Sequence, residues 1–279
     1  MREFCVNDAA ALVPSRGEEY AKWDLGSLLI VAGSYGMAGA AVLCGLGAVR
    51  TGAGLIRYSV PAEIIPILQT AVPEVMCLER DITAADRSRD AVAFGPGLGD
   101  HESDAELLYA FLTQHKGRMV IDADGLNDIS RYGLQDALRD SEADIVVTPH
   151  MGEAARLLGI ARAEGREECA SRIADRYGVT ALVKGSRTAV CSPEGDITVN
   201  TTGNPGLATA GSGDVLTGII GSFLAQGLRG PDAARLGAFV HGMAGDIAAA
   251  EFGQAGMSSK DLPLRAALAI KKLTGIDKE

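Results

Sequence analysis

The chain has 279 residues, of which 36 are acidic and 26 are lysine or arginine, so its formal charge is −10. This balance argues against a general nucleic-acid-binding protein, although it allows a local basic pocket for phosphates. The five cysteines are scattered without a Cys-x-x-Cys pair, which predicts free thiols in a reducing cytoplasm. We expect no signal peptide and no membrane span, because the required apolar runs are missing.

Short apolar runs alternate with helical patterns along most of the chain. A short helix from about residue 7 is stopped by Pro14. Strands are predicted at 28–31, 55–60, 74–78, 91–94, 119–122, 145–147, 180–183, 188–191 and 197–199. Helices are predicted at 37–50, 62–68, 102–115, 151–158, 164–177, 215–226, 231–251 and 259–273. This order predicts one α/β domain over 1–279, a mainly parallel sheet covered by helices on both faces, with an antiparallel edge near 188–199.

Four loops follow predicted strands directly, at 33–40, 95–99, 122–127 and 148–153. In open α/β sheets, ligands bind beyond the carboxyl ends of the strands. We therefore expect these loops to form a shared rim around a ligand. The 95–99 loop (Gly-Pro-Gly-Leu-Gly) has the wrong spacing for a dinucleotide fingerprint, and it is either a turn or a backbone wall facing the substrate.

Polar residues on the rim allow both structural and functional interpretations. Asp122 and Asp124 could bind a metal, but we favour Asp124 as a cap of the following helix, with Asn127 turned to a ligand. His150, in a Pro-His-x-Gly-Glu setting, is equally typical of a structural residue and of a ligand contact. His101, His115 and His241 are interpreted as structural residues, as are all five cysteines.

Two cations occur in the turn 184–188, which reads Lys-Gly-Ser-Arg-Thr between two strands. A solvated hairpin is the structural interpretation. In a chain of charge −10, the same turn is also a candidate for nucleotide contact.

The segment 200–214 is rich in glycine and hydroxyl side chains and leads directly into a helix. Gly211-Ser212-Gly213-Asp214 precedes apolar residues at helical spacing. Free backbone N–H groups and the positive end of the helix dipole make such a loop an anion site. The glycines could also simply shape a turn. Asp214 favours a function, because a carboxylate beside a phosphate site repels the ligand unless it handles a proton or a metal.

These motifs together resemble the ADP- or ATP-dependent NAD(P)H-hydrate dehydratases, which have the ribokinase-like fold. The matching stretches, in chain order, are Gly33–Ala41, Arg50–Leu55, Gly95–Gly99, Asp122–Asn127, Thr148–Glu153, Lys184–Thr188 and Asn200–Asp214. The resemblance covers nearly the whole chain, in the single-domain form without the epimerase domain. Two departures are Tyr20–Gly26, where the family has a His-Lys-Gly segment, and Ala210-Gly211-Ser212-Gly213, where Gly-Gly-Thr-Gly is common.

The resemblance implies dehydration of the S form of hydrated NADH or NADPH (NADHX or NADPHX). A nucleotide phosphorylates the hydroxyl of the hydrate, and loss of phosphate restores the cofactor. ADP is expected as the phosphoryl donor, giving AMP and phosphate, with ATP as the alternative. A magnesium ion is expected on the nucleotide phosphates rather than in a protein-built metal site. A cytoplasmic homotetramer acting alongside a separate epimerase is also expected.

The resemblance also assigns roles to individual residues. Asp214 becomes the catalytic base that takes the hydroxyl proton, beside a backbone anion hole. The expected substrate contacts are Ala40, Gly97, Gly99, Asn127, His150 and Asp214. The expected nucleotide contacts are Lys184, Gly185, Ser186, Arg187, Thr188, Gly211, Ser212 and Gly213. A small-molecule kinase of the same fold, for a hydroxymethylpyrimidine, a thiazole alcohol or a sugar, remains as an alternative, because it shares Gly-x-Gly-Asp. A non-catalytic nucleotide-binding protein is a second alternative, because a fold does not by itself determine function.

Overall fold

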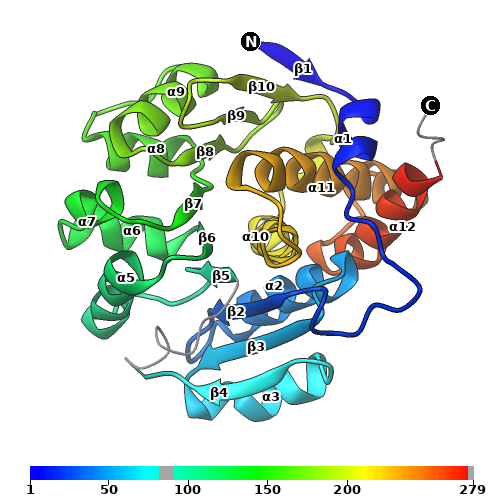
Figure 1. Cartoon of the computed structure of the whole chain (residues 1–279), viewed down its shortest axis with the longest axis horizontal. Coiled ribbons are helices and arrows are strands. Elements are labelled where there is room, and N and C mark those ends of the chain that lie inside the picture. The colour runs from blue at the N-terminus through cyan, green and yellow to red at the C-terminus, as the bar shows by residue number, and fades with distance from the viewer. Residues whose placement is uncertain (82–90, 276–279) are drawn as a thin grey trace.

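The computed structural model describes residues 1–81 and 91–275. Its strands form one ten-stranded sheet in the order β1-β10-β9-β8-β7-β6-β5-β2-β3-β4 (Figure 1). Their bounds are β1 (Arg2–Phe4), β2 (Ser27–Val31), β3 (Leu55–Val60), β4 (Met76–Glu79), β5 (Ala91–Phe94), β6 (Arg118–Ile121), β7 (Asp144–Val147), β8 (Thr180–Val183), β9 (Ala189–Cys191) and β10 (Ile197–Asn200). Neighbouring strands are parallel except where β9 pairs with β8 and β10. The predicted fold class is confirmed.

Helices cover both faces of the sheet, as Figure 1 shows. One layer holds α1 (Val6–Leu12), α2 (Ala38–Thr51), α3 (Ile65–Ala71), α10 (Ser212–Ala225), α11 (Gly230–Phe252) and α12 (Leu262–Thr274). The other holds α5 (Glu102–Gln114), α6 (Asp124–Arg131), α7 (Gln135–Arg139), α8 (Met151–Leu158) and α9 (Arg166–Tyr177). Short 3-10 turns lie at η1 (Ala62–Ile64), η2 (Pro205–Leu207) and η3 (Ser259–Asp261). None of the helices in the described ranges is long and apolar enough to span a membrane.

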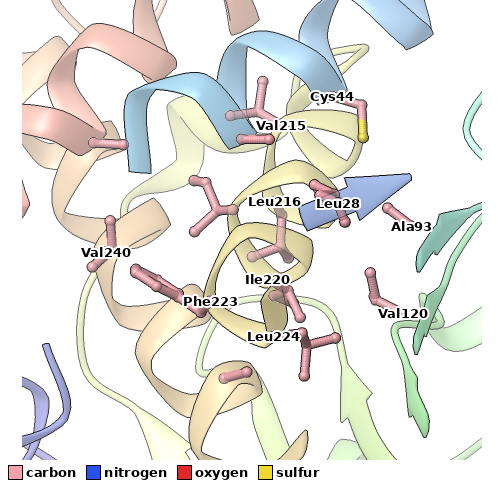
Figure 2. Close-up of a cluster of buried hydrophobic side chains, with 14 of the residues drawn as sticks. Leu28, Cys44, Ala93, Val120, Val215, Leu216, Ile220, Phe223, Leu224 and Val240 are labelled. Atoms are coloured by element: carbon pink, nitrogen blue, oxygen red, sulfur yellow. The ribbon is translucent and has the colours of Figure 1, made fainter. Parts of the chain in front are cut away.

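The continuous apolar runs of the strands place hydrophobic side chains on both faces of the sheet. In β2, Leu28 and Ile30 join the core under α2, α10 and α11, whereas Leu29 and Val31 join the core under α5 and α9. Successive strand residues point to opposite faces, so a sheet between two helical layers requires this sequence. Figure 2 shows the first core around α10, where Ile220 and Leu224 lie close to the strands.

The two helices α2 and α10 approach each other closely because a glycine of each helix faces the backbone of the other at their crossing. A methyl group on Gly218 would lie 1.9 Å from the carbonyl oxygen of Cys44, and one on Gly47 would lie 2.5 Å from that of Val215. The small residues of α2 therefore allow backbone contact. This contact places the N-terminus of α10 beside α2, where a methyl group on Gly211 would lie 2.3 Å from Cδ1 of Leu43.

Two parts of the fold differ from the sequence prediction. The N-terminal residues Arg2–Phe4 form β1, which pairs in parallel with β10 and becomes the outermost strand. The antiparallel strand β9 is consequently third from that edge of the sheet. In addition, residues after 123 form α6 and α7, which the apolar pattern of the sequence did not indicate as full helices.

Candidate active site

The four predicted rim loops lie side by side in the structure. They follow β2, β5, β6 and β7, which are consecutive neighbours in the sheet. The loops after β2 and β5 are in direct contact: the N–H of Gly33 donates to the carbonyl of Pro96 at 2.7 Å. A methyl group on Gly97 would lie 2.7 Å from Cβ of Ala40. Ala40, Gly97 and Gly99 therefore share one wall, as the sequence predicted for a common rim.

The predicted capping role of Asp124 is wrong. The N-cap of α6 is Ala123, with no capping side chain. The Asp124 carboxylate instead accepts a hydrogen bond at 2.9 Å from the N–H of Gly99, and so it holds the β5 loop against α6. Asn127 also has a protein partner, because its Oδ1 accepts two hydrogen bonds from the Arg156 guanidinium.

His150 is the N-cap of α8. Its Nδ1 accepts from the N–H groups of Gly152 (2.9 Å) and Glu153 (3.3 Å), and the Glu153 carboxylate accepts from the N–H of His150 at 2.8 Å. Partial burial, together with the positive charges of Lys184 and Arg156, lowers the pKa of His150. The imidazole is thus neutral at pH 7, and more than half of its surface is open to the rim.

The glycine loop, residues 200–213, ends at the N-terminus of α10. Gly211 is the N-cap with φ +86°, a backbone conformation that suits glycine. At Gly213 an added methyl group would be 3.5 Å from Nζ of Lys184 and 3.6 Å from Oδ2 of Asp122. The helix N-terminus therefore faces a partly buried cation, which fits the predicted anion site.

Helix α11 anchors the glycine loop from behind. Asn200 donates to the carbonyl of Ala238 at 3.2 Å, and Asp246 accepts from Gly203 and Asn204, each at 3.0 Å. The hydroxyl of Ser259 donates to the carbonyl of Ala210 at 2.5 Å. These bonds fix the glycine-rich backbone before any ligand arrives.

His241 is buried beneath the start of α10. Its Nε2 lies 3.0 Å from the carbonyl oxygen and 3.1 Å from Oγ of Ser212. Burial lowers the pKa of His241 to about 4, so the ring is neutral. The structural interpretation of His241 agrees with this position, although no sequence pattern indicates Ser212 as its partner.

Lys184 lies inside the site rather than in a solvated hairpin. Its Nζ is 2.6 Å from Oδ1 of Asp122 and 3.9 Å from Oε2 of Glu153. Oδ2 of Asp122 accepts a second hydrogen bond, from the hydroxyl of Thr217 on α10, at 2.7 Å. Burial opposes the charge of Lys184, but the two carboxylates outweigh it and raise the pKa of the ammonium group.

Arg187 extends away from this buried cluster. Its guanidinium pairs with Glu3 on β1 at 3.1 Å, and its side chain is largely exposed. Within the turn, the hydroxyl of Thr188 donates to the carbonyl of Gly185 at 3.0 Å. Of the two cations predicted for nucleotide contact, Lys184 is therefore the one adjacent to the anion site.

Asp214 is the first acidic residue of α10 and lies mostly buried beside the same cluster. Burial, together with the negative charge of Asp122, raises the pKa of Asp214 to about 6, although Lys184 opposes the shift. A carboxylate with such a pKa is ionised at pH 7 and is a stronger base than an exposed aspartate. Among the residues that the structure describes, no group of three acidic, histidine or cysteine side chains could hold a metal ion.

Comparison with known proteins identifies the family. Residues 28–265 match the family model described as NAD(P)H-hydrate dehydratase. The chain belongs to this family. An ADP-dependent (S)-NAD(P)H-hydrate dehydratase from Neisseria meningitidis is 40% identical over 238 residues, which cover 84% of this chain and 80% of that protein.

Solved structures of similar proteins agree with this family assignment. The ADP/ATP-dependent NAD(P)H-hydrate dehydratase from Bacillus subtilis, co-crystallised with ATP and Mg²⁺, has a TM-score of 0.86 at 28% identity, with 98% of each chain covered. A ribokinase-like superfamily protein from Enterococcus faecalis has a TM-score of 0.87 at 24% identity, covering 98% of this chain and 96% of that one, and it shares the fold. The chain spans about half the length of several bifunctional NAD(P)H-hydrate repair enzymes of the dehydratase family that it matches.

Proposed function

We propose that the protein is a single-domain, nucleotide-dependent dehydratase that converts the S form of NADHX or NADPHX to NADH or NADPH. The observation that carries the proposal is the position of Asp214. It lies in the first turn of α10, close enough to Lys184 and to the rim residues Asp122 and Asp124 for their charges to act on its carboxylate. The similarity to the ADP-dependent enzyme of Neisseria supports ADP as the phosphoryl donor.

In the proposed reaction, Asp214 takes the proton of the hydrate hydroxyl as the oxygen attacks the terminal phosphorus of ADP. The new P–O bond forms as the bond to AMP breaks. The backbone N–H groups of Gly211 and Gly213, at the N-terminus of α10, stabilise negative charge on the transferred phosphoryl group. The C–O bond then breaks with its electron pair going to phosphate, and loss of a proton from the adjacent ring carbon restores the double bond.

Lys184 is suited to neutralise a nucleotide phosphate. Its ammonium donates a hydrogen bond to Asp122, and Thr217 of α10 donates another to the same carboxylate. One carboxylate therefore positions both the cation and the helix that forms the anion hole. The side chain needs no rearrangement when the ligand binds, which favours electrostatic stabilisation of the transition state.

The residues present fit a magnesium ion held mainly by nucleotide phosphates. Mg²⁺ prefers oxygen ligands and commonly takes one or two carboxylates together with phosphates. Both oxygens of Asp122 accept hydrogen bonds, whereas in Glu153 only Oε2 accepts one from the backbone, so Oε1 of Glu153 could contribute a ligand. When bound, the ion would reduce the negative charge of the phosphates.

We further propose that the protein is a cytoplasmic homotetramer. We also propose that it works beside a separate epimerase, a pairing that the bifunctional repair enzymes among its relatives support.

The test is a cofactor-repair assay with each nucleotide in turn. Hydrated NADH or NADPH is incubated with the protein, Mg²⁺ and either ADP or ATP, and the absorbance of the reduced nicotinamide is followed. The proposal predicts recovery of the reduced cofactor together with release of inorganic phosphate. A stable phosphorylated alcohol without cofactor recovery would identify a kinase of the same fold instead. Nucleotide binding without turnover of any alcohol would identify a non-catalytic binding protein.

A further inference from the structure

A cavity of about 550 Å³ opens between α6 and α8, lined by Asn127, Ser130, Arg131 and Arg156. These helices follow β6 and β7, so the cavity adjoins the rim. Its volume is within the range typical of small-molecule sites. None of the roles assigned above explains why two arginines meet here.

Within the described ranges Arg156 forms no ion pair with a carboxylate, although its charge acts on Glu153 from a distance. Its Nε and Nη2 donate to the amide oxygen of Asn127 at 3.1 and 2.9 Å, and an amide carries no charge. Arg131 shares the cavity and pairs with Asp100 at the end of the β5 loop. In a chain of charge −10, an arginine that points at an amide rather than at one of 36 acidic residues indicates a site for an external anion.

The Arg156 guanidinium is oriented by a chain of hydrogen bonds that begins on the rim. The N–H of Gly99 donates to Asp124, the amide of Asn127 donates to the other oxygen of Asp124 at 3.4 Å, and Arg156 donates to Asn127. Asn127 is therefore a positioning residue for Arg156. A guanidinium held in this way is prepared to bind a planar or tetrahedral oxyanion through its remaining N–H groups.

Arg156 also lies beside the predicted substrate contact His150. A methyl group on Gly152 would be 2.8 Å from Cε1 of His150 and 3.7 Å from Nη1 of Arg156. The anion site at α10, by contrast, is next to Lys184 and serves the phosphoryl donor in the proposed function. The cavity is thus on the part of the rim that remains for the dinucleotide.

We propose that the cavity of Arg131 and Arg156 binds a phosphate group of the dinucleotide substrate. This proposal rests on the proposed function, because it names the part of NADHX or NADPHX that the cavity holds. Arginine is well suited to phosphate, since its fork of N–H groups matches two phosphate oxygens. The cavity is larger than one phosphate, so it also accommodates part of the attached sugar. The phosphate is either the pyrophosphate, common to both substrates, or the 2′-phosphate of NADPHX.

The first experiment compares kcat and KM of Arg156→Gln and Arg131→Gln with the unchanged protein, using NADHX and NADPHX. We expect KM to rise about 10-fold or more for Arg156→Gln with nearly unchanged kcat, because a charge-assisted hydrogen bond remote from the reacting atoms is lost. Arg229→Gln is the matched control, since Arg229 is exposed, lies away from the rim and pairs with Glu194. Thermal unfolding verifies that all three variants are folded.

The two substrates distinguish the source of the phosphate. A rise in KM confined to NADPHX assigns the cavity to the 2′-phosphate, and an equal rise for both substrates assigns it to the pyrophosphate. Unchanged KM for both substrates in the two rim variants overturns the proposal.

The second experiment does not depend on turnover. Titration calorimetry measures Kd for NADH and NADPH in the unchanged protein and in Arg156→Gln. Weaker binding by the variant supports the cavity even if the repair assay fails, in which case only the proposed function is lost. Equal binding by both proteins, or no binding by either, overturns the inference.

Discussion

The two sides of the site are held by different kinds of interaction. Around α10, the supporting contacts are buried: Lys184 is ion-paired with fully buried Asp122, and Thr217 bonds the same carboxylate. Around α6 and α8, the supports are exposed, as with His150 and the bond from Arg156 to Asn127. Buried charge pairs are expensive to disturb, whereas exposed polar contacts contribute little to stability. Under the proposed function, phosphoryl transfer would depend on the rigid side, and the exposed side would determine which dinucleotide binds.

Removing the proposed base should have the largest effect on activity. We expect Asp214→Asn to lower kcat by about 10²–10⁴-fold with little change in nucleotide affinity, because the variant cannot take the hydroxyl proton. Steady-state repair kinetics and calorimetric binding of ADP measure the two quantities. A variant with near-normal kcat would refute the role of Asp214 as the base.

Removing Lys184, the partner of the buried Asp122, should have the largest effect on stability. We expect Lys184→Met to lower the free energy of unfolding by about 3 kcal/mol, because Asp122 is left buried without its charged partner. The control is Lys116→Met, whose ion pair with Glu142 is exposed and whose loss should change stability by no more than about 0.5 kcal/mol. Urea unfolding of both variants measures the difference. Similar values for the two would show that burial does not separate the two sides of the site.

The stability of the α10 side should also depend on pH through Asp214. The folded pKa is raised from 3.8 to about 6, so the favourable contribution of the protonated acid is complete below about pH 4 and is lost as pH rises through 6. At pH 7, Asp214→Asn should therefore be more stable than the unchanged protein by about 1–3 kcal/mol. Unfolding measured between pH 4 and pH 8 tests this, and the stability advantage of Asp214→Asn should vanish at the acid end.

Catalysis should have the opposite pH dependence, since kcat/KM should fall below about pH 6 as the proposed base becomes protonated.

The smallest effect is expected at His150 on the exposed side. His150→Ala removes the N-cap of α8 and should cost about 1 kcal/mol, while His150→Asn retains a capping acceptor and should cost much less. Both variants should raise KM for the hydrate if the imidazole contacts it. The two variants separate capping from substrate contact, because asparagine should restore the stability that alanine loses but should not restore KM. A KM restored by asparagine would assign His150 to capping alone.

The sequence predicted the edge of the sheet where the site lies, because consecutive parallel strands bring their carboxyl ends together. Apolar runs such as 28–31 and the polar loops after them were sufficient for this. The pairing of Lys184 with Asp122 could not be predicted, because 62 positions separate them and no local pattern in the sequence links the two residues. Asp124 was misassigned because a carboxylate at a helix start usually caps it, and here it bonds Gly99 on another loop. The short, charged strand β1 likewise has no hydrophobic pattern to predict it.

The close crossing of α2 and α10 has a consequence for attempts to make the protein more heat-resistant. Replacing a helical glycine by alanine is a common way to gain up to about 1 kcal/mol, because alanine favours the helix. At Gly218 the added carbon would meet the backbone of α2 at 1.9 Å. The helices would have to separate, and the separation would shift the turn of α10 that carries Asp214. Glycine has a poor helix propensity, but at this crossing it is required for the placement of Asp214, the proposed base. Stabilisation by consensus or alanine substitutions should therefore leave Gly47 and Gly218 unchanged.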